Sequence, residues 1–242
     1  MEPLNWVPSM LRWVSIGLSA TFVASPAIAS PWSRGDSELY ARLAISRHTV
    51  DGLDGIRWDS YSEYGLSDDW TVSLKYERLE FDRFGEFDRD GWRVTARRGF
   101  TLPKGLVFAL EGGALSGDAI GGAAGCETLG AEARVSIGQS TRVGGDTVGQ
   151  DIFWFAEGAV RAHEDGCQRE RAEIGLGQRL YKDVWLVSQA WFDSGDSNAS
   201  SSKYQFEYLW KADGFDISAG TLIEFGGEFD ESAVFFAVAR TF

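Results

Sequence analysis

The sequence has few residues that would interrupt an extended chain. It contains five prolines, and the only one after Pro31 is Pro103. Proline lacks the amide hydrogen that a β-ladder needs, so it is rare inside paired strands. Helix signals are missing too, because no segment keeps a period of 3.6 residues behind a capping box. We therefore expect nearly the whole mature chain to be paired strand.

Long apolar runs are also absent. The one short run, Trp13–Ala24, follows Arg12 and precedes the small-x-small sequence Ala27–Ala29. These features predict a secretory signal peptide over residues 1–29, removed after about Ala29. An uncleaved anchor helix is the alternative, although the run is shorter than the roughly 18–20 residues that cross a bilayer. Since no later run approaches that length, a helical membrane protein is excluded.

Cysteine is scarce, and both cysteines, Cys126 and Cys167, lie in the part of the chain predicted to be exported. An even number of cysteines in an oxidising compartment predicts a disulfide between them. Two free thiols are the alternative.

The sequence does contain alternation with a period of two, most clearly in residues 90–113. Trp92, Val94, Ala96 and Phe100 share one parity, while Arg93, Thr95, Arg97 and Thr101 share the other. After a turn with Pro103 and Gly105 the alternation resumes, which predicts a hairpin. A soluble sandwich would bury the apolar face, whereas an outer-membrane barrel turns that face to lipid.

The same alternation recurs from Glu38 to Phe242 and predicts twelve strands after a short N-terminal segment, residues 30–37. Tight turns follow the second, fourth, eighth and tenth strands, whereas most other connections are longer. The segment Gly138–Asp151 breaks this rule, since it should be short and is not. Short turns at one end and long loops at the other are typical of outer-membrane barrels. We therefore predict an all-β fold, a transmembrane antiparallel up-and-down β-barrel of about twelve strands over residues 38–242.

Aromatic residues gather near both ends of the predicted strands. Trp70, Trp185, Trp210, Phe215 and Phe100 lie near the short turns, and Trp58, Trp92, Phe81 and Phe225 lie nearer the long loops. Two girdles at the membrane interfaces would produce this distribution. Cys126 and Cys167 fall at long-loop ends, so their bridge would join two extracellular loops.

The chain ends on AVFFAVARTF, with Val234, Phe236, Val238 and Phe242 on one parity. A terminal phenylalanine closing an alternating strand resembles the assembly signal of bacterial outer-membrane β-barrel proteins, although Arg240 departs from the pattern. The resemblance is to this whole class and covers residues 38–242. It implies a Gram-negative outer membrane, surrounding lipid, and the barrel assembly machinery as a partner that reads Phe242.

The strand parity places nearly equal numbers of acidic and basic side chains inside the barrel, so the net charge of −13 lies mostly in turns and loops. Interlocked ion pairs would close the lumen, whereas separated charges would line a wet pore. We expect a small porin-like channel for passive passage of small solutes. The alternative is a non-conducting structural or accessory barrel of the envelope, for example one supporting an export system. The predicted lumen-lining residues are Arg42, Arg57, Glu63, Arg93, Arg97, Glu111, Glu132, Arg134 and Glu173.

Other functions find less support in the sequence. The acidic loop around Asp82 and Asp88 offers oxygen ligands without the spacing of a calcium loop, so a solvated surface is expected instead. A barrel hydrolase would need His48 or His163 as a general base, and His163 lies beside acids in a loop where solvation is the simpler interpretation. No serine-nucleophile elbow, zinc spacing or phosphate-binding loop is found. We expect no enzyme, cofactor, metal or nucleic-acid partner.

Overall fold

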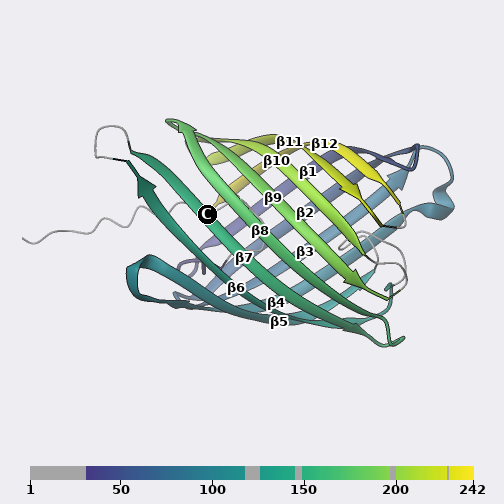
Figure 1. Ribbon diagram of the computed structural model, residues 1–242, viewed down its shortest axis with the longest axis horizontal. Helices are drawn as coiled ribbons and strands as arrows, with labels where there is room; N and C mark the ends of the chain where they lie inside the picture. Colours follow the sequence, from purple (N-terminus) through teal and green to yellow (C-terminus); the bar gives the residue numbers. More distant parts are fainter. Residues whose placement is uncertain (1–30, 118–125, 145–148, 197–199, 228) are drawn as a thin grey trace, which may run out of the picture.

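The chain forms a single closed barrel of tilted strands (Figure 1). The computed structural model describes residues 31–117, 126–144, 149–196, 200–227 and 229–242, so the predicted signal peptide lies outside the described residues. The twelve strands are β1 Leu39–Val50, β2 Leu53–Ser67, β3 Trp70–Phe81, β4 Arg89–Thr101, β5 Leu106–Gly117, β6 Gly130–Val143, β7 Gln150–His163, β8 Gln168–Tyr181, β9 Val184–Gly195, β10 Ser201–Ala212, β11 Phe215–Phe225 and β12 Glu231–Thr241.

Each strand pairs antiparallel with its neighbours in sequence, and β1 closes the barrel by pairing with β12. The closing register sets Leu43 opposite Val238 and Ala44 opposite Ala237. The predicted up-and-down barrel of twelve strands is thereby confirmed. Among the described residues, no helix is both long enough and apolar enough to cross a membrane.

The apolar face of the alternating strands points outward. Leu43 on β1 and Val234 on β12 are 68% and 63% exposed, whereas Arg97 on β4 is 2% exposed. A soluble sandwich would show the reverse, because water would expel the apolar side chains and solvate the charges. The outward face therefore matches a lipid environment, and the polar face is enclosed by the barrel.

The connections differ at the two ends of the barrel. The inner end, at the left of Figure 1, holds the start of β1, the end of β12 and the turns at 68–69, 102–105, 182–183 and 213–214. The outer end holds the loop at 82–88 and residues 226–227 after β11. Two expectations about loop lengths were wrong. Residues 51–52 form a tight turn at the outer end, because β1 and β2 extend further than predicted. Most of 138–151 is strand, because β6 continues to Val143 and β7 begins at Gln150.

The aromatic girdles are found with two corrections, and the first is that Phe81, expected in the outer girdle, shares the inward parity of Glu77 and Leu79 on β3. Trp70, Trp210 and Phe215 near the inner end and Trp58 near the outer end are exposed on the lipid face. Trp185 was also expected in the inner girdle, but it is 4% exposed and points into the lumen. Trp185 shares the parity of Gln189 and Asp193 on β9, which are also buried, so its place near the strand end did not indicate its direction. Trp185 instead packs in the interior cluster described below.

Candidate functional site: the barrel lumen

The nine residues predicted to line the lumen all point into the barrel. Their side chains are at most 12% exposed. They come from β1, β2, β4, β5, β6 and β8. They do not form one uniform lining, however, because the structure divides them between two arcs of the wall that pair their charges differently.

One arc, from β2 to β7, carries a continuous ladder of ion pairs, which we call the interlocked arc. Arg97 Nη2 lies 2.7 Å from Glu63 Oε1, and Arg97 Nη1 lies 3.5 Å from Glu111 Oε2. Arg134 Nε lies 4.0 Å from Glu111 Oε1, and Arg134 Nη2 lies 2.8 Å from Glu132 Oε1. The chain of opposite charges therefore passes from β2 through β4 and β5 to β6 without interruption.

The ladder branches at Glu132. This carboxylate accepts from Arg134 and also pairs with Arg161 of β7, while Arg93 Nη1 lies 3.4 Å away. Arg134 in turn also pairs with Glu157 on β7. Charges buried this deeply are tolerated only when each has several partners, because the cost of removing them from water is several kcal/mol per ion, roughly. The interlocked arc therefore behaves as a rigid polar wall.

The remaining arc, from β8 through β12 to β1 and the outer part of β2, carries separate ion pairs, and we call it the open arc. Arg171 binds Asp193 with two contacts of 2.7 Å, Nε to Oδ1 and Nη2 to Oδ2. Lys203 Nζ lies 2.6 Å from Glu224 Oε2. Each of these pairs joins neighbouring strands.

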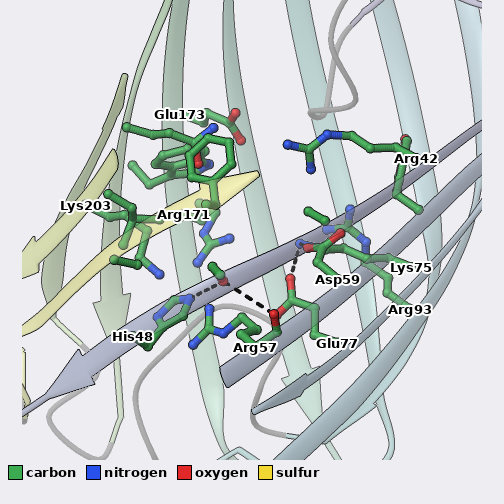
Figure 2. Close-up of a pocket in the computed structure, with 18 of the residues that line it drawn as sticks. Arg42, His48, Arg57, Asp59, Lys75, Glu77, Arg93, Arg171, Glu173 and Lys203 are labelled. Carbon is green, nitrogen blue, oxygen red and sulfur yellow. Dashed lines mark hydrogen bonds and ion pairs between the residues drawn. The ribbon is translucent and has the colours of Figure 1, made fainter. Parts of the chain in front are cut away.

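A cavity of about 160 Å³ lies against the open arc in the outer half of the lumen (Figure 2). Basic side chains dominate its lining, and Figure 2 shows them pointing inward from several strands. The acidic side chains of the lining are Asp59, Glu77 and Glu173. The basic ones are Arg42, Arg57, Lys75, Arg93, Arg134, Arg171 and Lys203. The cavity offers a solute charged and hydrogen-bonding groups of both signs.

The inner half of the lumen is blocked by an apolar cluster. It comprises Phe153 and Phe155 of β7, Trp185 and Val187 of β9, and Leu209 of β10. The aromatic rings of β7 lie over Gly175 and Gly177 of β8, where any Cβ would collide with them. These two glycines are therefore required by the close approach of the rings, and they allow a large apolar cluster to fit inside the barrel.

The N-terminal segment, residues 31–37, lies inside the inner end of the barrel. Trp32 packs edge-on against Phe153, with ring centroids 6.0 Å apart, and so joins the apolar cluster. Arg34 Nε donates to Glu63 Oε2 at 2.5 Å, and Arg97 Nη2 donates to the Trp32 carbonyl oxygen at 2.8 Å. The segment is therefore held by the ladder on one side and by the cluster on the other.

Glycines on three strands make room for this segment. A Cβ on Gly138 of β6 would lie 2.8 Å from Pro31 Cγ, one on Gly99 of β4 would strike the Ser33 hydroxyl, and one on Gly65 of β2 would strike the Gly35 carbonyl. All three glycines face inward on charged or polar parities. The barrel wall is thus recessed where the N-terminal segment lies.

A second hollow, of about 530 Å³, opens at the inner end beside the cluster. It is lined by the ends of β6 to β10, including Arg142, Asp151, Arg179 and Lys211. Three inward-facing residues of β9 show the arrangement from the inner to the outer end: Trp185 borders this hollow, Val187 belongs to the cluster, and Trp191 borders the outer cavity. The cluster with Trp32 therefore separates the two hollows.

The two histidines lie in different surroundings. His48 is buried in the lumen wall between Ser46 and Glu231. His163, expected to be solvated in a loop, is instead 8% exposed at the end of β7, with Nδ1 2.8 Å from the Thr128 carbonyl oxygen. The expectation was wrong because β7 continues to His163, which places the ring against the start of β6.

Cys126 and Cys167 form a disulfide at the outer end, with Cα atoms 5.6 Å apart. Cys126 precedes β6 and Cys167 precedes β8, so the bridge joins the β5–β6 and β7–β8 connections. The β5–β6 connection lies within the interlocked arc, and the β7–β8 connection joins that arc to the open arc. The cross-link therefore ties the outer rim of the more rigid wall.

Phe242 lies at the seam that closes the barrel. Its amide donates to the Leu39 carbonyl oxygen at 2.8 Å, and the Leu39 amide donates back to Phe242 at 3.2 Å. Val234, Phe236, Val238 and Phe242 are all exposed on the lipid face. Arg240 shares that face, and its guanidinium stacks over the Phe242 ring at 4.8 Å.

The acidic loop at 82–88 is occupied by internal contacts. Asp82 binds Arg47 through both oxygens, and Asp88 Oδ1 accepts from the Phe81 amide at 2.9 Å. The hydrogen bond from Arg47 lowers the pKa of Asp82 below its ordinary value. These carboxylates therefore stabilise the loop rather than pointing together toward one centre.

The inward orientation of several charged lumen residues was not predicted from strand parity. Arg34 precedes the first strand, Lys203 and Glu231 begin β10 and β12, and Asp193 lies near the end of β9. Lys203, Asp193 and Glu231 were the first or last residues of their predicted strands, and their inward orientation was missed. The register of β1 with β12 would have revealed Glu231, because it lies two residues along from the position opposite His48.

No family model and no curated protein matches the sequence. Solved structures do match its fold. The NanC porin superposes with a TM-score of 0.61 at 9% identity, covering 82% of this chain and 98% of that one. An outer-membrane channel from Pseudomonas putida F1 gives 0.57 at 7% identity over 90% and 100%. The KdgM porin in complex with oligogalacturonate gives 0.51 at 9% identity over 83% and 99%. The chain therefore has the fold of bacterial outer-membrane β-barrel proteins.

Proposed function

We propose that the protein is a narrow porin-like channel for small hydrophilic solutes in the outer membrane of a Gram-negative bacterium, reached after export by the predicted signal peptide. The observation that carries this proposal is the space inside the barrel that water can enter, a cavity of about 160 Å³ in the outer half and a hollow of about 530 Å³ at the inner end. The fold shared with the NanC and KdgM porins supports it.

The solute path in the outer half runs mainly beside the open arc, and Arg93 and Arg134 of the interlocked arc complete its lining. In the outer cavity, fixed charges of both signs select solutes by size and by their ability to exchange hydrogen bonds with the wall. The narrowest point is the apolar cluster, where Trp32 meets Phe153. Passage therefore requires a shift of the N-terminal segment away from the cluster, and conductance of the resting channel is small.

Single-channel recording of the refolded mature protein in a planar bilayer tests the proposal. We expect small, discrete steps for the wild type and larger steps for Trp32→Ala, because removing the indole widens the point between the two hollows. Trp210→Ala is the matched control, since Trp210 lies on the lipid face at 52% exposure and its removal leaves the lumen unchanged. Repeating the recording with reductant tests whether the Cys126–Cys167 bridge influences gating.

A non-conducting structural or accessory barrel is the second candidate, and the continuous ladder from Glu63 to Glu132 favours it. A folded, inserted protein that stays silent in both wild type and Trp32→Ala would establish this alternative. The search would then move to envelope partners that bind the barrel. In both cases Phe242 is expected to be read by the barrel assembly machinery, so Phe242→Ala should lower the amount of inserted barrel.

A further inference from the structure

Three side chains at the outer end of the lumen form a hydrogen-bonded chain that the channel proposal does not use. Ser46 and His48 both point inward from β1, two residues apart, and Ser46 Oγ lies 2.6 Å from His48 Nε2. On the other side of the imidazole, His48 Nδ1 contacts Glu231 Oε1 of β12. The pairing of β1 with β12 brings the carboxylate to the histidine.

The order of these contacts fixes the direction of the hydrogen bonds. An ionised carboxylate only accepts, so Nδ1 carries the proton and Nε2 of the neutral ring is the acceptor. The Ser46 hydroxyl therefore donates to Nε2. Glu231 is kept ionised by Arg57, whose Nη2 lies 3.1 Å from Glu231 Oε1. A serine hydroxyl on Nε2 and a carboxylate on Nδ1 is the arrangement that activates serine as a nucleophile.

The chain opens onto the outer cavity. Ser46, His48 and Arg57 all line it, and Figure 2 shows His48 and Arg57 side by side at its edge. Ser46 is only partly buried, so its oxygen is accessible from the cavity. Its other polar contact is a longer one, 3.5 Å from the Arg57 carbonyl oxygen.

An electrophilic group is also present. Arg57 Nε is buried, and among the described residues it has no hydrogen-bond partner. A buried donor without an acceptor is costly, roughly 1–3 kcal/mol, unless a ligand supplies one. The oxyanion that forms on an ester carbonyl during attack by a serine is an acceptor of this kind, and a guanidinium is suited to stabilise it.

We propose that Ser46, His48 and Glu231 form an esterase site that hydrolyses small carboxylic esters entering the lumen, a function beyond solute passage. Ser46 Oγ forms a bond to the ester carbonyl carbon while His48 Nε2 takes the hydroxyl proton. The bond to the leaving alcohol then breaks, and His48 returns the proton to that alcohol. Water hydrolyses the acyl-serine by the same proton path, which releases the carboxylic acid and restores Ser46.

The surroundings restrict the substrate to short acyl groups on polar molecules. A cavity of about 160 Å³ is close to the roughly 150 Å³ that holds one benzene molecule. Its lining is charged, whereas long acyl chains of membrane lipids lie on the opposite face of the wall. Acetyl esters of hydrophilic compounds fit this cavity, and phospholipids do not.

The test uses the refolded full-length mature protein in detergent, with p-nitrophenyl acetate as substrate and a fluorophosphonate as an active-serine probe. We expect hydrolysis above the buffer rate and a covalent label on the peptide that contains Ser46. Ser46→Ala should lose both, and His48→Ala should lower both by at least about 100-fold, as expected for removal of a general base. Ser218→Ala is the matched control, because Ser218 is another buried lumen serine, and it should keep wild-type rates.

Glu231 acts through His48 and is therefore a positioning residue. Glu231→Gln should lower kcat and move the pH profile, while Glu231→Asp should restore part of the rate. Heat-modifiable migration on gels confirms that each variant is folded. A folded wild type with no label and no hydrolysis above buffer, or a Ser46→Ala variant with unchanged hydrolysis, would overturn the proposal. Because this assay needs no membrane or conductance, its failure is separate from failure of the channel proposal.

Discussion

The two arcs of the lumen wall have similar compositions but pair their charges in different ways. On the interlocked arc Glu132 has three arginine partners and Arg134 has three glutamate partners. On the open arc Arg42 pairs with Glu207 of β10 and Lys203 pairs with Glu224 of β11. A charge with several partners cannot turn toward a solute without leaving the others, whereas a charge in a single pair can exchange its partner. The arrangement of pairs, and not the number of charges, therefore divides the wall into a structural and a functional part.

The largest expected effect comes from breaking the ladder at its centre. Arg134→Leu leaves Glu111, Glu132 and Glu157 without a shared cation, and loss of one partner from a buried ion pair costs about 3–5 kcal/mol. Urea unfolding in lipid vesicles measures this change in the free energy of unfolding. Arg78→Ala is the matched control, because Arg78 pairs with Glu80 at an exposed position where such a pair contributes roughly 0–1 kcal/mol. Equal losses in the two variants would show that the ladder does not act as a unit.

The disulfide offers a second way to loosen the interlocked arc. Replacing both Cys126 and Cys167 by serine removes a cross-link between residues 41 positions apart, and such a cross-link typically contributes about 2–4 kcal/mol. We expect a lower unfolding midpoint and faster proteolysis of the β5–β6 connection. Addition of reductant to the wild type should reproduce the effect. If the midpoint stayed constant, strand pairing alone would hold the outer rim.

A smaller effect is expected on the open arc. Lys203→Gln leaves Glu224 without its cation, but the adjacent cavity admits water that can solvate the carboxylate. The free energy of unfolding should fall by about 1–2 kcal/mol, below the range for a buried pair that is broken without solvation. The double variant Lys203→Gln and Glu224→Gln should recover most of this loss. A loss as large as that of Arg134→Leu would mean that the two arcs are equally rigid.

The smallest effect is expected outside the barrel, at the pair of Asp82 and Arg47. Because the pKa of Asp82 is lowered in the folded state, its contribution is present above the unfolded pKa and is lost as pH falls through the folded pKa. The carboxylate is exposed to solvent, so stability should show almost no change over this acidic range. A titration of the Asp82 carboxyl carbon by NMR should show the lowered pKa, and Arg47→Gln should return it toward the ordinary value.

The fold could be predicted from the sequence because its signal is repeated twelve times. Each strand shows the same alternation, so an error at one boundary, such as the one at 51–52, does not change the barrel. Side-chain direction followed from parity for residues in strand interiors, including Arg97 and Glu132. It failed for Trp185, because that residue was assigned to the girdle from its place near a strand end, whereas it shares the inward parity of Gln189 and Asp193 on β9.

The site was less predictable, because it depends on which side chains meet. Parity indicates that Ser46 and His48 share a face, but only the register of β1 with β12 brings Glu231 to the imidazole. Likewise parity cannot tell a ladder from separate pairs, since both use the same alternating arginines and glutamates. The position of residues 31–37 inside the barrel was not predictable from a segment with no periodicity at all.

The contacts of the N-terminal segment also record an order of assembly. Trp32 and Pro31 are the first described residues of the chain, yet their partners Phe153 and Gly138 belong to β7 and β6. The N-terminal segment cannot dock until β6 and β7 have formed. The first residues of the mature chain are therefore among the last to reach their native contacts. Fluorescence of Trp32 would therefore report the point in assembly at which the sheet closes into a barrel.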